Sequence, residues 1–318
     1  MLHLRLMLPA ERSAEVTELL AAHVGVANLA VLAGCAVKPA GDVVLADVAR
    51  ESADEIIATL LDRGIDRVGT ISLDAIDTSV SLSAERAEAD APGEGSDAVI
   101  WEQVVRTSYA ESALSATYFA FLTIATLLAA CAIVLDSAVL IVGAMVLGPE
   151  FGAIAALAVG IVHRRGKVLR RAVVALLSGF AVAIVLTTLF ALLARGLGWI
   201  DTSLTTASRP QTGFIIAPDK WSLVVAFIAG IAGVLSLTAA RAGALVGVFI
   251  SVTTVPAAAN VALAIALTDL REVREALVQL AVNVGAIVVA GIATMLVQRT
   301  LWRRVPHVAP RPTGSHRS

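Results

Sequence analysis

Hydrophobic positions follow two different patterns along the chain. Up to about residue 77 they alternate with polar positions or recur at helical spacing, whereas beyond residue 115 they merge into long apolar runs. Leu2–Leu8 alternates as a half-buried strand does, and Val16, Leu19 and Leu20 recur as on one face of a helix. The later runs approach the roughly 20 residues needed to cross a hydrocarbon core. The pattern therefore predicts a soluble portion followed by a membrane portion.

The soluble portion, residues 1–77, is predicted to be a small α+β domain of the ferredoxin-like type. Alternating and helical segments follow one another in the order βαββαβ, which defines that plan. This order and size resemble the ACT-type regulatory domains, although no ligand motif points to an effector. We expect strands at 2–8, 26–33, 42–48 and 67–76, helices at 10–24 and 52–63, and a turn at 34–41.

Two connecting segments separate the soluble domain from the apolar runs. Residues 78–96 are predicted to be a linker, because charged positions are followed by a sequence rich in proline and glycine. Residues 97–115 then have one apolar side, with Trp101 and Tyr109 placed as interfacial aromatics often are. This second segment is expected to be an amphipathic helix at the membrane surface.

The membrane portion, residues 116–298, is predicted to hold about six transmembrane helices. Arginine and lysine gather in the link His163–Arg171, at Arg241 and in the tail 299–318. These three segments share one side if six spans alternate, and the positive-inside rule makes that side cytoplasmic. Both termini are then expected in the cytoplasm and the protein in the plasma membrane. The expected spans are about 116–135, 137–162, 171–194, 221–240, 244–268 and 276–297.

Composition strengthens the membrane assignment and narrows the chemistry. The chain is 58% hydrophobic and 16% charged, with a mean hydropathy of +0.84, against about 45–50% apolar and 25% charged in soluble domains. Residues 1–80 carry twelve acids against six bases, which disfavours nucleic-acid binding. The two cysteines and five histidines show no disulfide or metal-site spacing. No cofactor, metal or enzyme motif is found, and no secretory signal peptide opens the chain.

The second apolar run contains a proline and a carboxylate at Gly148-Pro149-Glu150. Proline interrupts the helical hydrogen-bond ladder, and a charge at this depth costs several kcal/mol. Pro149 can begin a half-helix, whose first turn favours a carboxylate such as Glu150. Glu150 then either satisfies backbone amides or an arginine of another span, or acts as a protonatable or cation-binding group on a transport path.

The fifth and sixth runs carry further polar groups. Ser251, Thr253 and Thr254 precede Pro256, and Asn260 follows it by one turn. These groups can satisfy the backbone freed by the proline, or they can coordinate a cation or polar solute. Asn283 in the sixth run can form an interhelical hydrogen bond or contribute to binding.

The two proline-containing runs suggest an internal repeat. Each is the middle member of a group of three spans, so spans one to three and four to six form two candidate repeats. Since three is odd, the second group starts on the opposite face, which gives inverted topology. Interrupted helices at matching positions of such halves typically mark a transporter's binding site.

The membrane portion also resembles a known family. The run from Asp136 to Pro149, the run from Ala244 to Pro256 and the segment around Asn283 are similar to the prokaryotic "uncharacterised hydrophobic protein" family, domain of unknown function 389. The likeness covers about residues 97–298 and implies the architecture more than an activity. Family members often have Asn-Ser-Pro where this chain has Asp136-Ser137-Ala138, and many have an apolar residue at Glu150. The resemblance implies that the broken backbone is shared and that Glu150 is this chain's own specialisation.

These observations predict a membrane transporter of a small solute or ion, coupled to H⁺ or Na⁺, with its path between spans two and five. The candidate binding residues are Gly148, Pro149, Glu150, Ser251, Thr253, Thr254, Pro256, Asn260 and Asn283. The expected partners are membrane lipid, the transported solute or ion and further copies of the chain. A non-transporting sensor or scaffold that uses the ferredoxin-like domain to bind an effector is the alternative, and a channel is a third.

Overall fold

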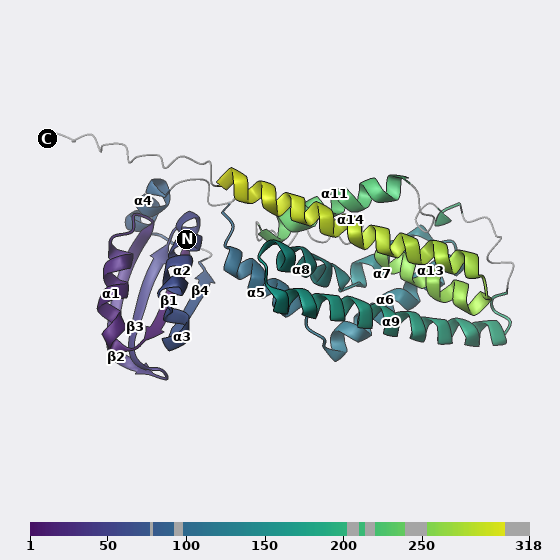
Figure 1. Cartoon of the computed structure of the whole chain (residues 1–318), viewed down its shortest axis with the longest axis horizontal. Coiled ribbons are helices and arrows are strands. Elements are labelled where there is room, and N and C mark those ends of the chain that lie inside the picture. Colours follow the sequence, from purple (N-terminus) through teal and green to yellow (C-terminus); the bar gives the residue numbers. More distant parts are fainter. Residues whose placement is uncertain (77–78, 92–97, 202–209, 214–219, 239–252, 303–318) are drawn as a thin grey trace. The chain divides into compact units, whose positions relative to one another are not determined.

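The structure is a computed structural model of the chain that describes residues 1–76, 79–91, 98–201, 210–213, 220–238 and 253–302. The described residues divide into two compact units, Met1–Glu102 together with the last residues Leu301 and Trp302, and Gln103–Thr300. Figure 1 labels the helices and strands of each unit.

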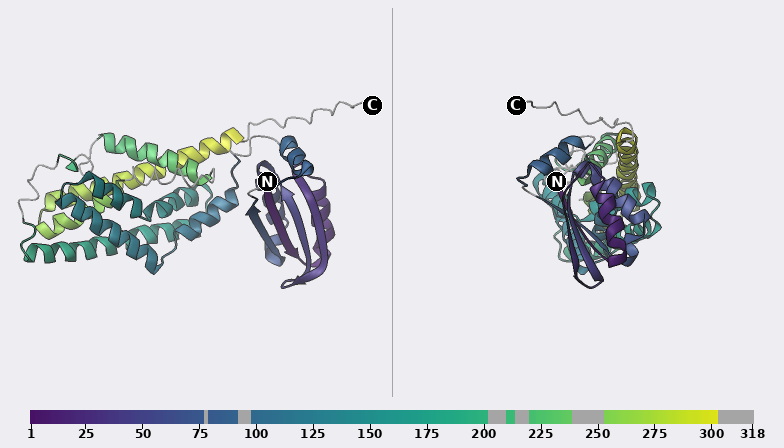
Figure 2. Two further views of the ribbon diagram at one scale, coloured as in Figure 1. Left: turned by 180° about the vertical axis from the view of Figure 1, so that it is seen from behind. Right: turned by 90° about the vertical axis from the view of Figure 1, so that its left-hand side faces the viewer.

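The N-terminal unit is built on a four-stranded antiparallel sheet with the strand order β2-β3-β1-β4. Views from the front and from behind show α1 and α2 on one face of this sheet (Figures 1 and 2). Leu4 and Leu6 of the central strand β1 are buried against Val16 of α1 and Ile56 of α2. The apolar residues that alternate along the strand and those that recur along the helices therefore form one core. The predicted order βαββαβ is confirmed, with one short helix added. The elements are β1 (Leu2–Leu8), α1 (Ala10–Ala21), β2 (Val26–Val37), β3 (Ala40–Val48), α2 (Arg50–Asp62), α3 (Ile65–Val68) and β4 (Thr70–Ala75).

Two local predictions in this unit are wrong. The expected turn over 34–41 is reduced to residues 38–39, because β2 continues to Val37 and β3 begins at Ala40, where the two strands pair. The residues of this edge strand are mostly small and exposed, so they do not alternate between apolar and polar. The strand is held by backbone hydrogen bonds to β3. The expected linker 78–96 contains the helix α4 (Leu82–Asp90), whose first turn is capped by Ser81. Its alanines at positions 84 and 87 are buried, and the helix packs against β2 and β3.

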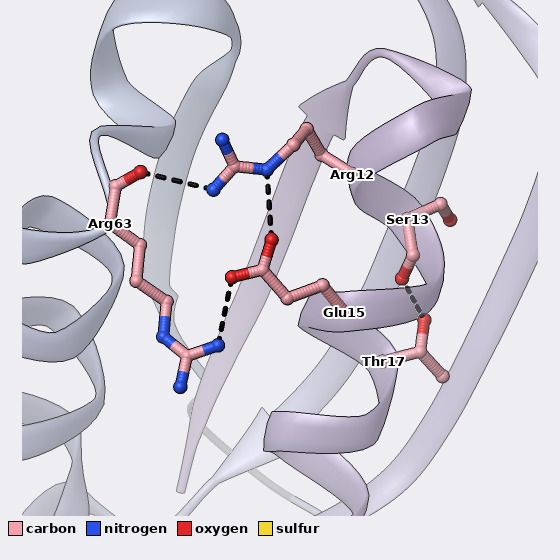
Figure 3. Close-up of polar contacts among 5 residues, drawn as sticks. All are labelled: Arg12, Ser13, Glu15, Thr17 and Arg63. Carbon is pink, nitrogen blue, oxygen red and sulfur yellow. Dashed lines mark hydrogen bonds and ion pairs between the residues drawn. The ribbon is translucent and has the colours of Figure 1, made fainter.

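Surface ion pairs join the two helices that cover the sheet. Glu15 of α1 accepts a hydrogen bond from Nε of Arg12 and another from Arg63 after α2, each 2.9 Å long (Figure 3). Arg12 also donates to the backbone carbonyl of Arg63 over 3.0 Å. The Arg63 hydrogen bond is the main reason that the pKa of the Glu15 carboxyl is lowered.

The second unit is helical and apolar. Four of its helices are long and apolar enough to cross a membrane, and a fifth span is added if the bent pair α7 and α8 is counted as one. The chain is therefore a multi-pass integral membrane protein. Six spans are not reached among the described residues, because α13 is a shorter apolar helix of 14 residues. The helices are α5 (Trp101–Glu111), α6 (Ala116–Val134), α7 (Ala138–Leu147), α8 (Glu150–Val162), α9 (Gly166–Gly196), α11 (Lys220–Thr238), α13 (Thr254–Leu267) and α14 (Leu270–Trp302).

The two longest helices, α9 and α14, run the length of this unit with shorter helices between them (Figure 1). Helix α8 packs against α9, and Ala158 of α8 lies beside Gly291 of α14. Helix α13 packs against α6 and α9, while its first residues contact α14. The starts of α8 and α13 are thus held inside the bundle, where the candidate residues lie.

The predicted surface helix is shorter than expected and is fastened to the bundle. Helix α5 ends at Glu111, and the guanidinium of Arg171 lies 4.2 Å from the centre of the Tyr109 ring. Arg171 also donates to the backbone carbonyl of Ser112 over 3.3 Å. Arg171 belongs to the basic link that predicts the cytoplasmic side of the membrane. It therefore also has a packing role, against α5 and the residues after it. The last part of the predicted basic tail, residues 303–318, lies outside the described residues.

Candidate functional site

The chain bends sharply where the sequence places Gly148-Pro149. Helix α7 ends at Leu147 and α8 begins at Glu150, with an angle of 54° between the two. Pro149 has no backbone N–H, so the ladder that would join the two helices cannot continue through it. The predicted break in the second span is present, and its two sides are separate short helices.

Glu150 occupies the first turn of α8 and is buried. The residue is 2% exposed, and its Oε1 accepts a 2.7 Å hydrogen bond from the hydroxyl of Thr254 at the start of α13. Its second oxygen, Oε2, has no hydrogen-bond partner among the described residues and lies against Gly148. A side chain at position 148 would meet both this oxygen and Val255. Only glycine therefore fits at position 148 without displacing the Glu150 carboxylate or Val255.

The start of α13 is the second half of the site. Thr253 precedes the helix, Thr254 is its first residue and Pro256 lies in its first turn, where a missing N–H is tolerated. The sequence placed Pro256 in the middle of a span, but in the structure it follows the beginning of a helix. The upstream residue Ser251 and the rest of 239–252 lie outside the described residues.

Asn283 of α14 joins the site through Thr253. The side-chain amide donates to the Thr253 hydroxyl over 2.6 Å and approaches its backbone carbonyl at 3.5 Å. The residue is 1% exposed, and its Oδ1 has no hydrogen-bond partner among the described residues. The predicted interhelical bond of Asn283 is thus present, and the amide oxygen is left free.

Asn260 is buried but lies apart from this group. It is 4% exposed, and it follows Thr254 by six residues, or about 9 Å along the axis of α13. Its Oδ1 also has no hydrogen-bond partner in the described part of the chain. The structure therefore brings together Gly148, Pro149, Glu150, Thr253, Thr254 and Asn283, and it leaves Asn260 further along the helix.

Two contacts around Glu150 were not expected from the sequence. Phe151 lies against Gly233 of α11 so closely that a Cβ at position 233 would overlap its ring. Glu111 at the end of α5 lies against Gly152 in the same way, and burial raises the pKa of the Glu111 carboxyl. The first turn of α8 thus contacts α13, α11 and α5 through three successive residues. Nothing in the sequence around Gly233 indicates Phe151 as its partner.

The assembled group offers one carboxylate, two hydroxyls and one amide in apolar surroundings. Such a set can exchange a proton, coordinate a cation or hydrogen-bond a polar solute. No group of three or more histidine, cysteine, aspartate or glutamate residues that could hold a metal ion occurs in the described ranges.

Comparison with known proteins finds a likeness for part of the membrane portion. A protein-family model described as "Domain of unknown function (DUF389)" matches residues 145–289. This stretch runs from the end of α7 into α14 and includes every residue of the assembled site. No curated protein and no solved structure matches the chain. The match and the apolar helices agree: the chain is a membrane protein, and its residues 145–289 are similar to the DUF389 family.

Proposed function

We propose that this protein transports a small solute or ion across the membrane, and that the transported species passes the junction of α7, α8 and α13. The observation that carries the proposal is the buried Glu150 carboxylate at the bend, held by Thr254 from a distant helix. A carboxylate inside a membrane protein is costly and usually marks a substrate or ion pathway. Interrupted backbone at membrane depth is tolerated only where it is buried in protein or lines a water-filled cavity, and Gly148 at this bend is buried.

The proposal includes an architecture of six spans in two inverted groups of three. In this arrangement the pair α7 and α8 corresponds to α13, and both meet at the midplane of the membrane. The direct bond between Glu150 and Thr254 supports this correspondence, because inverted repeats bring their interrupted helices together at the binding site. Both termini would lie in the cytoplasm, on the side of the exposed basic residues Arg164 and Lys167.

Flux through reconstituted protein tests the proposal. The full chain would be placed in liposomes, and uptake of a panel of ions and small polar solutes would be measured together with charge movement. We expect at least one compound to be taken up, with about 10-fold or greater loss in Glu150→Gln. The matched control is Glu275→Gln, which removes a carboxylate that pairs with Arg271 on the surface.

Two outcomes would count against transport. Absence of uptake for every compound would contradict the function, and equal uptake by the wild type and Glu150→Gln would contradict the site. Discrete single-channel currents in planar bilayers would identify a channel in place of a carrier.

A sensor or scaffold is the second candidate, because the N-terminal unit has its own sheet and its own buried core. In that case the membrane portion would anchor the domain and assemble copies of the chain. Deletion of residues 1–96 separates the two functions. A transporter should retain flux without the domain, whereas a sensor should lose its response to any effector.

A further inference from the structure

The junction holds buried oxygen atoms that can accept hydrogen bonds but receive none. Glu150 Oε2 and Asn283 Oδ1 both lack a donor among the described residues, and their residues are 2% and 1% exposed. Leaving a buried acceptor unpaired is unfavourable, so such atoms require an explanation. Two of them in one region point to a ligand that interacts with oxygen.

These two oxygens belong to one group of side chains. Asn283 binds Thr253, and Glu150 binds Thr254, which is the next residue in the chain. The bond to Thr253 uses the amide nitrogen of Asn283 and leaves its oxygen available. The Thr254 hydroxyl gives its hydrogen to Glu150, so its own lone pairs also remain available. The Thr253 hydroxyl accepts from Asn283 and keeps its own hydrogen, but the other oxygens named here, on Glu150, Thr254 and Asn283, present lone pairs.

The adjoining end of α7 favours positive charge as well. The last carbonyls of a helix carry the negative end of its dipole, and Pro149 cannot donate to them. Glu150 Oε2 lies against Gly148 at this same end. The starts of α8 and α13 would attract an anion, but the Glu150 carboxylate already occupies the first turn of α8 and would repel one.

The number of charges selects the class of cation. Glu150 forms no ion pair within the described residues, so one negative charge stands among neutral oxygens. Sites for calcium or magnesium usually combine several carboxylates or retain several waters. A single carboxylate with amide and hydroxyl oxygens matches a monovalent hard cation.

We infer that Glu150, Thr254 and Asn283 form a binding site for a monovalent metal cation of the size and hardness of Na⁺. The inference rests on the proposed function, because it assigns the coupling ion to the transport site itself. Binding of the cation would neutralise Glu150 and draw the starts of α8 and α13 towards the middle of α14, where Asn283 lies. A polar solute could then pass or bind beside a neutral junction.

Direct binding measurements test the site without any solute. Purified full-length protein would be titrated with radioactive ²²Na⁺, and its thermal unfolding would be recorded in NaCl, KCl and choline chloride at equal ionic strength. We expect saturable Na⁺ binding and a higher unfolding temperature in NaCl than in choline chloride. Glu150→Gln and Asn283→Ala should each weaken Na⁺ binding at least about 10-fold and remove the shift.

Gln298 on the same helix is the matched control. Like Asn283, it donates its side-chain amide to a threonine hydroxyl, that of Thr238 at 2.8 Å, and its Oε1 has no partner among the described residues. It lies 15 residues further along α14, or about 22 Å from the site. Gln298→Ala should therefore bind Na⁺ like the wild type, even if it unfolds at a lower temperature.

The possible outcomes separate this inference from the proposed function. Equal unfolding in all three salts with no ²²Na⁺ binding would overturn the cation site, and so would unchanged binding in Glu150→Gln. Solute uptake that persists in choline medium would then leave the transport function standing. Conversely, Na⁺ binding without uptake of any compound would support the cation site and count against transport.

Discussion

The Thr254 hydroxyl donates a 2.7 Å hydrogen bond to Glu150, although the two residues lie 104 positions apart in the chain. This bond connects the first turns of two short helices, α8 and α13. It is also the one side-chain hydrogen bond that Glu150 accepts from another described residue. The arrangement of the site therefore depends on a contact that no local segment could form by itself.

Replacement of Thr254 should show what this bond contributes. Thr254→Val keeps the shape of the side chain but leaves a buried carboxylate oxygen without its donor, which we expect to cost about 1–3 kcal/mol of stability. Thr254→Ser keeps the hydroxyl and should retain most of that stability. Thermal unfolding of both variants in the same detergent provides the comparison. Equal unfolding temperatures for the two would show that the bond is unimportant.

Gly148 should tolerate no side chain. A methyl group there would meet the Glu150 carboxylate and would lie 2.8 Å from Cγ2 of Val255, so Gly148→Ala must displace one of them. We expect this variant to reduce flux and Na⁺ binding together. Gly143→Ala in the preceding helix α7 is the control, since its nearest neighbour would be Leu128 at an ordinary 4.0 Å. If both alanine variants behave alike, the close approach at Gly148 does not shape the site.

Gly233 should be equally sensitive for a different reason. A side chain at this position would overlap the ring of Phe151, which is buried next to Glu150. Gly233→Ala is expected to destabilise the protein by about 1–3 kcal/mol, the usual cost of overpacking. Gly285→Ala in α14 meets no atom within 4 Å and should be tolerated. Unfolding temperatures of the purified variants would decide the point.

Asp136 should hold the segment at residues 210–213. Its carboxylate accepts hydrogen bonds from the backbone of Gln211 and from the backbone and hydroxyl of Thr212, the shortest at 2.8 Å. Asp136→Ala should speed hydrogen exchange at this segment, by up to about 100-fold if a charged bond of about 3 kcal/mol is lost. Asp136→Asn should have a smaller effect, because asparagine still accepts and tolerates the positive φ of 46°. Unchanged exchange in Asp136→Ala would contradict this role.

Glu15 should stabilise the N-terminal domain in a pH-dependent manner. Its carboxyl pKa is lowered in the folded protein, chiefly by the hydrogen bond from Arg63. The stabilisation is therefore present above the ordinary glutamate pKa and is lost as the pH falls through the lowered value. Hydrogen exchange of α1 in the wild type and Glu15→Gln should differ near neutral pH and converge in acid.

Salt and a second variant control the Glu15 experiment. The difference should shrink in high salt, because both partners lie on the surface and are screened. Glu11→Gln removes a charge from the same helix at a residue that forms no ion pair within the described ranges, and it should have little effect. A difference between the wild type and Glu15→Gln that grows on acidification would contradict the assignment.

Some features of the site could be read from particular residues. Pro149 lacks an N–H wherever it stands, so a break in the second apolar run was predictable, as was the burial of Glu150 within it. The two proline-containing runs, which the sequence pairs as a candidate site, meet in the structure at the starts of α8 and α13. Asn260 was grouped with them because it follows Pro256 closely in sequence, yet the rise of the helix carries it about 9 Å beyond Thr254.

Other features had no local signal. Phe151 and Gly233 are ordinary residues of apolar helices, and such helices show no polar side that would indicate which neighbour each face meets. Helix α4 was missed because its buried positions are alanines among charged residues. The extension of β2 was missed because its hydrogen bonds come from β3 rather than from its own residues.

Local chemistry thus accounts for the membrane character, the βαββαβ order and the break at Pro149. Each of these depends on a property that the residues keep in any surroundings. The properties are the length of an apolar run, the period at which apolar residues recur, and the absence of a backbone N–H in proline. The pairing of Glu150 with Thr254, the link from Asn283 to Thr253 and the separation of Asn260 depend on how distant helices pack. Packing is set by the shapes of many side chains at once, and these contacts therefore appear only when the whole bundle is assembled.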